Sequence, residues 1–194
     1  MTAPRVLAFA GSLRAGSWNK KLVAIAANGA RAAGAEVTML DLRDLPMPIY
    51  DADEESQHGL PANAQRFKQL LVEHHGVLVA SPEYNSSITA VLKNAVDWAS
   101  RAEPGEPPLV AYRGKIAGVM SASPGALGAV RSLGTIRALL AHLGMVVVPA
   151  QLGVPRASEA FDDSGSLKDA KQQAAVEKIG TDVVYFVQKL NLSR

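Results

Sequence analysis

Short apolar segments alternate along this chain with longer segments whose apolar residues recur every three or four positions. The short segments are apolar at nearly every position, which is typical of strands buried on both faces of a parallel sheet. They cover residues 6–10, 36–40, 77–80, 116–120 and 145–148. The sequence therefore predicts five strands covered by helices.

The longer segments have the period of an α-helix and follow the strands in turn. They cover residues 22–33, 62–72, 88–99, 133–143 and 176–190, with polar connections at 45–61, 103–108 and 149–166. Strictly alternating strands and helices predict right-handed crossovers and a doubly wound α/β fold. We expect one domain over residues 1–194, a three-layer sandwich with the flavodoxin-like strand order 2-1-3-4-5.

Composition and charge exclude several classes of function. The 194 residues carry 20 basic and 18 acidic side chains, and a net charge of +2 is too small to favour nucleic-acid binding. The absence of cysteine excludes thiolate catalysis and cysteine–zinc sites. The four histidines lack a metal-binding spacing, so no metal site is expected, and the adjacent His74 and His75 are predicted at the surface.

The chain shows no targeting segment and no apolar run long enough to span a membrane. We therefore expect a soluble, cytoplasmic protein without a membrane partner.

Three loops of unusual composition follow the first, third and fourth strands. They cover residues 11–19, 81–87 and 121–128 and are rich in Gly, Ser and Asn. Ligands of open α/β sheets bind beyond the carboxyl ends of the strands, where the strand order changes direction. Because these three strands are neighbours in the expected order, their loops should converge on one crevice.

The first loop has the composition of an anion site. Ser12, Arg14, Ser17 and Asn19 offer polar donors just before a helix, whose N-terminus favours a phosphate. The alternative is that Ser17 is only a helix N-cap and Arg14 a solvated side chain. Ser17 stands where a P-loop needs Lys, and no G-x-G-x-x-G follows the first strand. These donors therefore favour a single phosphate monoester, as in FMN.

Three motifs together resemble the NADPH-dependent FMN reductase family, which includes flavodoxin-like quinone, azo and chromate reductases. They are the Gly11-Ser-Leu-Arg-x-x-Ser-x-Asn19 loop, the Pro82-Glu-Tyr-Asn85 loop and the Leu92-Lys-Asn-Ala-Val-Asp-Trp98 helix. The similarity extends from about residue 5 to residue 148. It implies bound FMN, NADPH or NADH as co-substrate, small-molecule electron acceptors, and a homodimer or homotetramer with the flavin near the interface.

The resemblance also implies site residues. The phosphate would be held by the four polar residues of the first loop, with Trp18 nearby. Other residues would line the ribityl chain and the isoalloxazine ring, namely Pro82, Glu83, Tyr84, Asn85, Ser121, Ser123 and Gly125. No catalytic side chain is implied, because the flavin carries the chemistry. For Glu83 and Tyr84 the alternative is an ordinary turn after Pro82.

The helix over residues 92–98 has two interpretations. Lys93, Asp97 and Trp98 could lie at a subunit interface, as the resemblance implies. Alternatively, Trp98 is a core residue and Asn94 makes a cap or turn contact.

The chain departs from the family pattern after Asn85. The family loop commonly reads Asn-Gly-Ser-x-Pro-Gly, whereas this chain has Ser86, Thr89 and Ala90 in place of the two glycines and the proline. A glycine would permit a positive φ, which other residues rarely adopt. We expect Ser86 to have an ordinary negative φ, so that Ser86→Gly would destabilise the protein.

The expected function is that of an NAD(P)H-dependent quinone or flavin reductase with a ping-pong mechanism. A flavodoxin-like electron carrier is the alternative, but carriers that steer to basic partners are typically acidic, and this sequence has a pI near 8.9. A phosphate-ester hydrolase has no supporting nucleophile or acid pair in the sequence.

Overall fold

Five parallel strands form the centre of this computed structural model, which describes residues 2–190. The strands are β1 (Arg5–Ala10), β2 (Glu36–Leu40), β3 (Gly76–Ala80), β4 (Ile116–Ala122) and β5 (Val146–Val154). Their order, β2-β1-β3-β4-β5, confirms the predicted flavodoxin-like sheet. The predicted domain limits, residues 1 and 194, lie outside the described residues.

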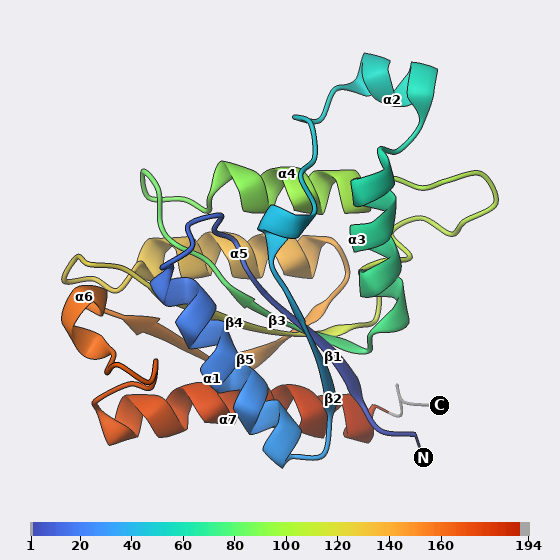
Figure 1. Cartoon of the computed structure of the whole chain (residues 1–194). Coiled ribbons are helices and arrows are strands. Elements are labelled where there is room, and N and C mark those ends of the chain that lie inside the picture. The colour runs from blue at the N-terminus through green and yellow to red at the C-terminus, as the bar shows by residue number, and fades with distance from the viewer. Residues whose placement is uncertain (1, 191–194) are drawn as a thin grey trace.

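Helices cover both faces of the sheet, as Figure 1 shows. One face, called here the closed face, packs against α1 (Trp18–Ala32) and α7 (Ala170–Lys189). The other, called here the open face, packs against α3 (Ala62–Glu73), α4 (Ala90–Ala99) and α5 (Val130–His142). Two short helices, α2 (Ala52–His58) and α6 (Ala157–Ala160), and the 3-10 turn η1 (Leu42–Asp44) lie in connections.

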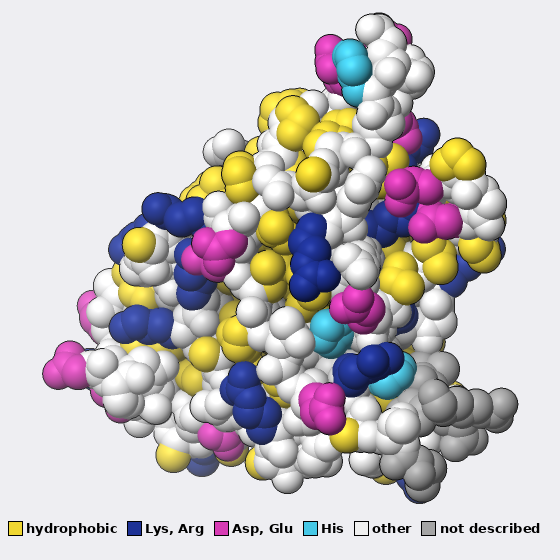
Figure 2. All heavy atoms as spheres, turned by 45° about the vertical axis from the view of Figure 1, so that its right-hand side comes forward, with side chains coloured by type: hydrophobic (Ala, Val, Ile, Leu, Met, Phe, Trp, Pro, Cys, Tyr) yellow, Lys and Arg dark blue, Asp and Glu magenta, His cyan; other side chains and the backbone are white. Residues whose placement is uncertain are grey.

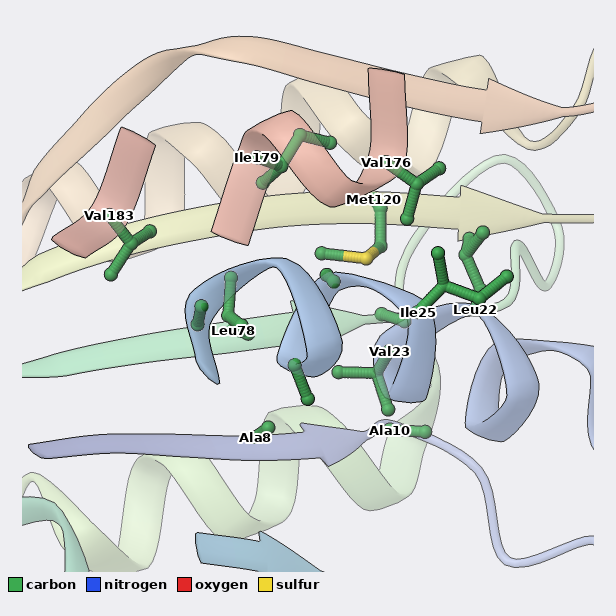
Figure 3. Close-up of a cluster of buried hydrophobic side chains, with 14 of the residues drawn as sticks. Ala8, Ala10, Leu22, Val23, Ile25, Leu78, Met120, Val176, Ile179 and Val183 are labelled. Carbon is green, nitrogen blue, oxygen red and sulfur yellow. The ribbon is translucent and has the colours of Figure 1, made fainter. Parts of the chain in front are cut away.

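The alternation of side chains along the central strands produces two separate cores. Val6, Ala8 and Ala10 point toward the closed face, whereas Leu7 and Phe9 point toward the open face. Figure 3 shows the core of the closed face, where side chains of α1 and α7 meet those of the sheet. Because β1, β3 and β4 are buried on both sides, their sequences are apolar almost throughout.

Two glycines bring α1 and α7 into backbone contact. A Cβ added at Gly180 would lie 1.9 Å from the carbonyl oxygen of Ala26, and one added at Gly29 would lie 2.1 Å from that of Glu177. No side chain larger than hydrogen fits at either position.

Four structural expectations from the sequence were wrong. All five strands were expected to be buried on both faces, but β2 and β5 are edge strands, and no residue of β2 is buried. The last strand continues to Val154 through Pro149, because β5 is an edge strand and its register shifts opposite the segment Ala117/Val119. The connection over residues 45–61 contains α2, which buries none of its side chains and so lacks apolar periodicity. His74 is buried, and its ring contacts the Leu70 carbonyl (2.6 Å) and the Thr38 hydroxyl (2.8 Å).

No helix within residues 2–190 has the length and apolarity needed to cross a membrane.

Candidate functional site

A pocket of about 190 Å³ opens at the carboxyl edge of the sheet, where the three predicted loops meet. Nine of the twelve predicted site residues line it, together with Ala122 and Pro124. The nine are Ser12, Arg14, Ser17, Trp18, Asn19, Pro82, Glu83, Tyr84 and Ser123. The expected convergence of the loops on one crevice is therefore confirmed. Ala122 and Pro124 were missed because neither side chain carries a chemical signal in the sequence.

The first loop offers unpaired hydrogen-bond donors to this pocket. Of the backbone N–H groups from Ser12 to Asn19, only that of Ser17 has an acceptor within residues 2–190, the Arg14 carbonyl at 3.2 Å. Ser17 occupies the N-cap of α1, yet its side chain makes no capping bond. The hydroxyl of Ser17 and the N–H groups of Trp18 and Asn19 thus remain available to an anion at the positive end of a 15-residue helix.

Arg14 adds a positive charge beside these donors. Its guanidinium lies 4.7 Å from the centre of the Trp18 ring and has no carboxylate partner within the described chain. Two side chains from outside the loop hold its backbone: Thr89 donates to the Gly11 carbonyl at 2.7 Å, and Arg43 donates to the Leu13 carbonyl at 2.9 Å. The donors are therefore arranged before any ligand arrives.

Asn19 forms a clamp between α1 and β4. Its side-chain N–H donates to the Ala122 carbonyl and its oxygen accepts from the Ala122 N–H, both at 2.9 Å. This buried pair fixes the first loop relative to the third. A role for Asn19 in holding a phosphate stays a prediction, to which one remaining amide hydrogen could contribute.

The second loop contains a tight turn in which two non-glycine residues have positive φ. Asn85 and Ser86 have φ of 51° and 64°, and Tyr84 and Ser87 exchange backbone hydrogen bonds of 3.0 and 3.1 Å across them. Positive φ at both central residues is typical of a type I′ turn, which favours Asn-Gly. The expectation of a negative φ for Ser86 was therefore wrong, because the turn imposes the conformation that glycine would adopt more easily.

The Glu83 side chain has an unexpected partner. Its carboxylate accepts hydrogen bonds from the backbone N–H groups of Arg131 (3.0 Å) and Ser132 (3.2 Å), in the first turn of α5. The backbone N–H groups of Glu83, Asn85 and Ser86 have no acceptor within residues 2–190.

The third loop contributes Ser123, whereas two other predicted residues lie off the pocket. Ser121 is fully buried and donates to the Gly128 carbonyl at 2.8 Å, so it holds the loop together. Gly125 turns the chain and donates to the Ser123 hydroxyl oxygen at 3.2 Å. Asn85 also lies outside the pocket lining, at the tip of the second loop.

The motif in α4 positions a strap formed by residues 45–51. Asn94 accepts from the Tyr50 N–H and donates to the Pro48 carbonyl, and Trp98 donates to that same carbonyl, each at 2.8 Å. Trp98 is 1% exposed. The packing interpretation of Asn94 and Trp98 is confirmed, whereas Lys93 pairs with Asp97 on the surface at 2.6 Å.

The strap forms one wall of an apolar groove of about 260 Å³ on the open face. Its lining includes Pro46 and Met47 of the strap, Val91 of α4, and Leu13 of the first loop. Leu13 thus connects the groove to the loop that offers the donors. Figure 2 shows hydrophobic side chains gathered below the protruding α2, and Ile49 of the strap is 77% exposed.

Comparisons with known proteins agree with these motifs. The family described as NADPH-dependent FMN reductase matches residues 4–159. The chain is 33% identical over 175 residues to the NAD(P)H-dependent FMN reductase of Pseudomonas aeruginosa, covering 90% of each chain. It is 34% identical over 145 residues to the quinone reductase of Escherichia coli, covering 74% of this chain and 73% of that protein.

A solved structure is also similar. It is FerB, an NAD(P)H:(acceptor) oxidoreductase from Paracoccus denitrificans, with a TM-score of 0.80 and 28% identity over 96% of this chain and 98% of FerB.

Proposed function

Because this chain belongs to the NADPH-dependent FMN reductase family, we propose that its carboxyl-edge pocket holds the FMN with which it takes hydride from NADH or NADPH. The protein is an NAD(P)H-dependent flavin or quinone reductase that uses FMN. Its acceptors are quinones or related small molecules, and the proposal extends to free flavin, azo compounds and chromate. The whole chain would form one FMN-binding domain.

The donor set of the first loop carries the assignment of the pocket. The loop combines unpaired N–H groups, two hydroxyls, the guanidinium of Arg14 and a helix N-terminus, and it contains no carboxylate. This chemistry fits one phosphate monoester and not the diphosphate of a dinucleotide, for which the loop lacks the glycine pattern. Ser12, Arg14 and Ser17 would hold the phosphate.

The other two loops would position the remainder of the cofactor. The unpaired N–H groups of Glu83, Asn85 and Ser86 would donate to the polar edge of the ring system, where they stabilise charge that develops on reduction. The flavin supplies the hydride and electron chemistry when bound. No side chain of the pocket needs to act as an acid or a base.

Cofactor binding tests the assignment directly. Hydrogen bonds to a charged group contribute about 1.5–3 kcal/mol, so Arg14→Ala or Ser17→Ala should weaken FMN binding roughly 10- to 150-fold. Arg31→Ala is the matched control, because Arg31 is exposed in the last turn of the same helix and should leave the affinity unchanged. Unchanged affinity in both site variants, or extracted FAD in place of FMN, would contradict the proposal.

We propose further that NAD(P)H and the acceptor occupy the pocket in turn. The sequence has no second nucleotide-binding fingerprint, and one opening serves the three loops. Double-reciprocal plots with NADPH and a quinone should give parallel lines, whereas intersecting lines would show a ternary complex. Rapid mixing with NADPH alone should bleach the flavin, which an electron carrier of flavodoxin type would not do.

A homodimer or homotetramer is also part of the proposal. The groove beside Leu13 and the exposed Ile49 support it, because contiguous apolar surface is typical of subunit contacts. Ile49→Asp should shift the mass measured by light scattering toward the monomer, and Tyr185→Asp, at an exposed apolar position on α7, should not. Equal masses for Ile49→Asp and wild type would contradict this interface. We place the protein in the cytoplasm, where its co-substrate is made and used.

A further inference from the structure

The carboxylate of Glu83 joins two walls of the pocket. Glu83 lies in the second loop, and its two acceptor bonds end on the Arg131 and Ser132 N–H groups, directly after the third loop. Within residues 2–190, the hydrogen bonds that connect the segment 82–88 to the segment 123–132 all involve this carboxylate. Glu83 is therefore the side chain whose hydrogen bonds join these two segments across the pocket.

Helix α5 has no cap of its own that could replace Glu83. Its N-cap residue is Ala129, with φ of 61° and no capping side chain, and its first turn contains no acidic residue. Orphan N–H groups at a helix N-terminus require an acceptor, and an acceptor from elsewhere in the chain couples the helix to that element. In most helices a local Ser or Asp supplies the acceptor for the first N–H groups. In α5 this acceptor is the carboxylate of Glu83, from another loop.

The same bonds control where a negative charge lies. An unpartnered carboxylate in the pocket wall would repel the phosphate and the electron-rich reduced ring of the cofactor. Here the carboxylate is only 13% exposed and faces the positive end of a 13-residue helix, which offsets its charge. The negative charge is therefore held at the wall, away from the space between the loops.

The side chain of Arg131 contributes less than its backbone. Its Nη1 lies 3.4 Å from Glu83 Oε1 and the side chain is 57% exposed, so solvent screens the pair. The position of the Glu83 carboxylate is therefore determined by its hydrogen bonds from the two backbone N–H groups.

We propose that Glu83 is a positioning residue that sets the affinity of the pocket for FMN by tying the second loop to α5. This inference rests on the proposed function, and it assigns Glu83 a contact with the protein in addition to its place in the pocket lining. Removing the carboxylate would release the second loop and leave α5 uncapped. Both effects lower stability, but only release of the loop lowers cofactor affinity at temperatures where the fold is intact.

The test compares FMN affinity with thermal stability in five variants of the full chain. FMN dissociation constants are measured from quenching of flavin fluorescence, and melting temperatures are measured without FMN. Glu83→Ala should weaken FMN binding about 10-fold and lower the melting temperature. Glu83→Gln keeps one acceptor oxygen and should lie between wild type and Glu83→Ala. Arg131→Gln keeps the backbone bonds and should change the affinity by less than about threefold.

A second-site variant separates capping from positioning. Val130→Asp introduces a carboxylate into the exposed first turn of α5, where it should stabilise the helix N-terminus. Added to Glu83→Ala, it should restore much of the melting temperature while FMN binding stays weak. Alone, it should leave the affinity within about twofold of wild type.

Two results would overturn the inference. One is wild-type FMN affinity in Glu83→Ala, and the other is recovery of affinity together with stability in the Glu83→Ala/Val130→Asp double variant. Failure of the wild-type protein to bind FMN would instead contradict the proposed function, so the two failures are distinguishable.

Discussion

The closed face of the sheet is packed to the level of backbone contact, whereas the open face retains unfilled space. On the closed face, Gly29 and Gly180 let α1 and α7 approach until no Cβ fits between them. On the open face, a cavity of about 10 Å³ lies among Phe67, Leu92 and Ile136, and the apolar groove lies outside it. The closed face is a rigid support, and the open face carries the surfaces on which another molecule can pack.

This difference between the faces explains how the two sides of the pocket are held in position. The first loop, for which we propose phosphate binding, is attached to α1, which the closed face holds in place, and Asn19 clamps that helix to β4. The second loop leads into α4 of the open face and depends on single contacts such as those of Glu83 and Thr89. One side of the pocket is thus fixed by the core, and the other by individual hydrogen bonds.

The largest expected loss of stability comes from disrupting the contact between α1 and α7 on the closed face. Gly180→Ala would place a Cβ 1.9 Å from a backbone oxygen, so α7 must move, at a cost of about 3 kcal/mol. Gly134→Ala is the control, because Gly134 is an exposed glycine of α5 with no atom within 4 Å of an added Cβ. It should stabilise the protein by roughly 0.5–1 kcal/mol in urea unfolding. Equal effects of the two changes would contradict the contrast between the faces.

The next largest loss of stability is expected when the strap of the open face loses a contact. Asn94→Ala removes the side-chain amide that accepts from the Tyr50 N–H and donates to the Pro48 carbonyl. Because the Tyr50 N–H is left without a partner, the free energy of unfolding should fall by about 2 kcal/mol. Residues 45–60 should become sensitive to limited proteolysis before the protein unfolds. Asn63→Ala removes an exposed bond to the Pro46 carbonyl and should have a much smaller effect. A strap that resists protease in Asn94→Ala would show that its other contacts, such as those of Trp98 and Asn63, are sufficient to hold it.

The stability of the protein should depend on pH through His74, which lies where α3 of the open face meets β2. Burial lowers the pKa of His74 below its ordinary value, and the nearby Arg5 and Lys115 also disfavour its charged form. Its stabilising contribution is therefore complete above the unfolded-state pKa of about 6.5 and is lost as the pH falls through the lower folded-state pKa. The melting temperature should fall between pH 7.5 and pH 5, and less steeply in His74→Gln. His58→Gln, at an exposed position, should retain the full slope.

The smallest expected effect concerns the tip of the second loop. A non-glycine residue with positive φ costs about 1 kcal/mol, so Ser86→Gly should raise the melting temperature by about 2–4 °C with FMN saturating. Ser87→Gly, at the neighbouring position without a positive φ, should lower stability instead. A lower melting temperature in Ser86→Gly would show that the turn is not strained.

The fold could be predicted from the sequence because the pattern of apolar residues that indicates each strand and helix is local and recurs along the chain. Apolar runs such as Val77–Val79 identify buried strands, and the alternation with helices fixes their order. The position of α2 did not follow from apolar periodicity, since none of its residues is buried. A local signal was present nonetheless: Asp51 at the N-cap, with Glu54 three positions later and Gly59 at the end.

The site was only partly predictable for a different reason. The residue types of the first loop predicted an anion site directly, because the donors proposed for it include the side chains of Ser17 and Arg14, which line the pocket. The partners of Glu83 and Asn19 lie 48 and 103 positions away in the chain. Periodicity and spacing carry no information about such pairings, which depend on how the loops are placed by the finished fold.

The backbone contact between α1 and α7 also has a consequence for synthesis of the protein. The first long helix to leave the ribosome packs against the sheet and against the last described helix, so α1 cannot bury the whole of its apolar side before α7 has been translated. Until then the part of α1 around Ala26 and Gly29, which α7 covers, is exposed on the nascent chain, where a chaperone would bind it. We expect chains halted before residue 170 to be degraded in the cell, and completed chains to fold only upon release.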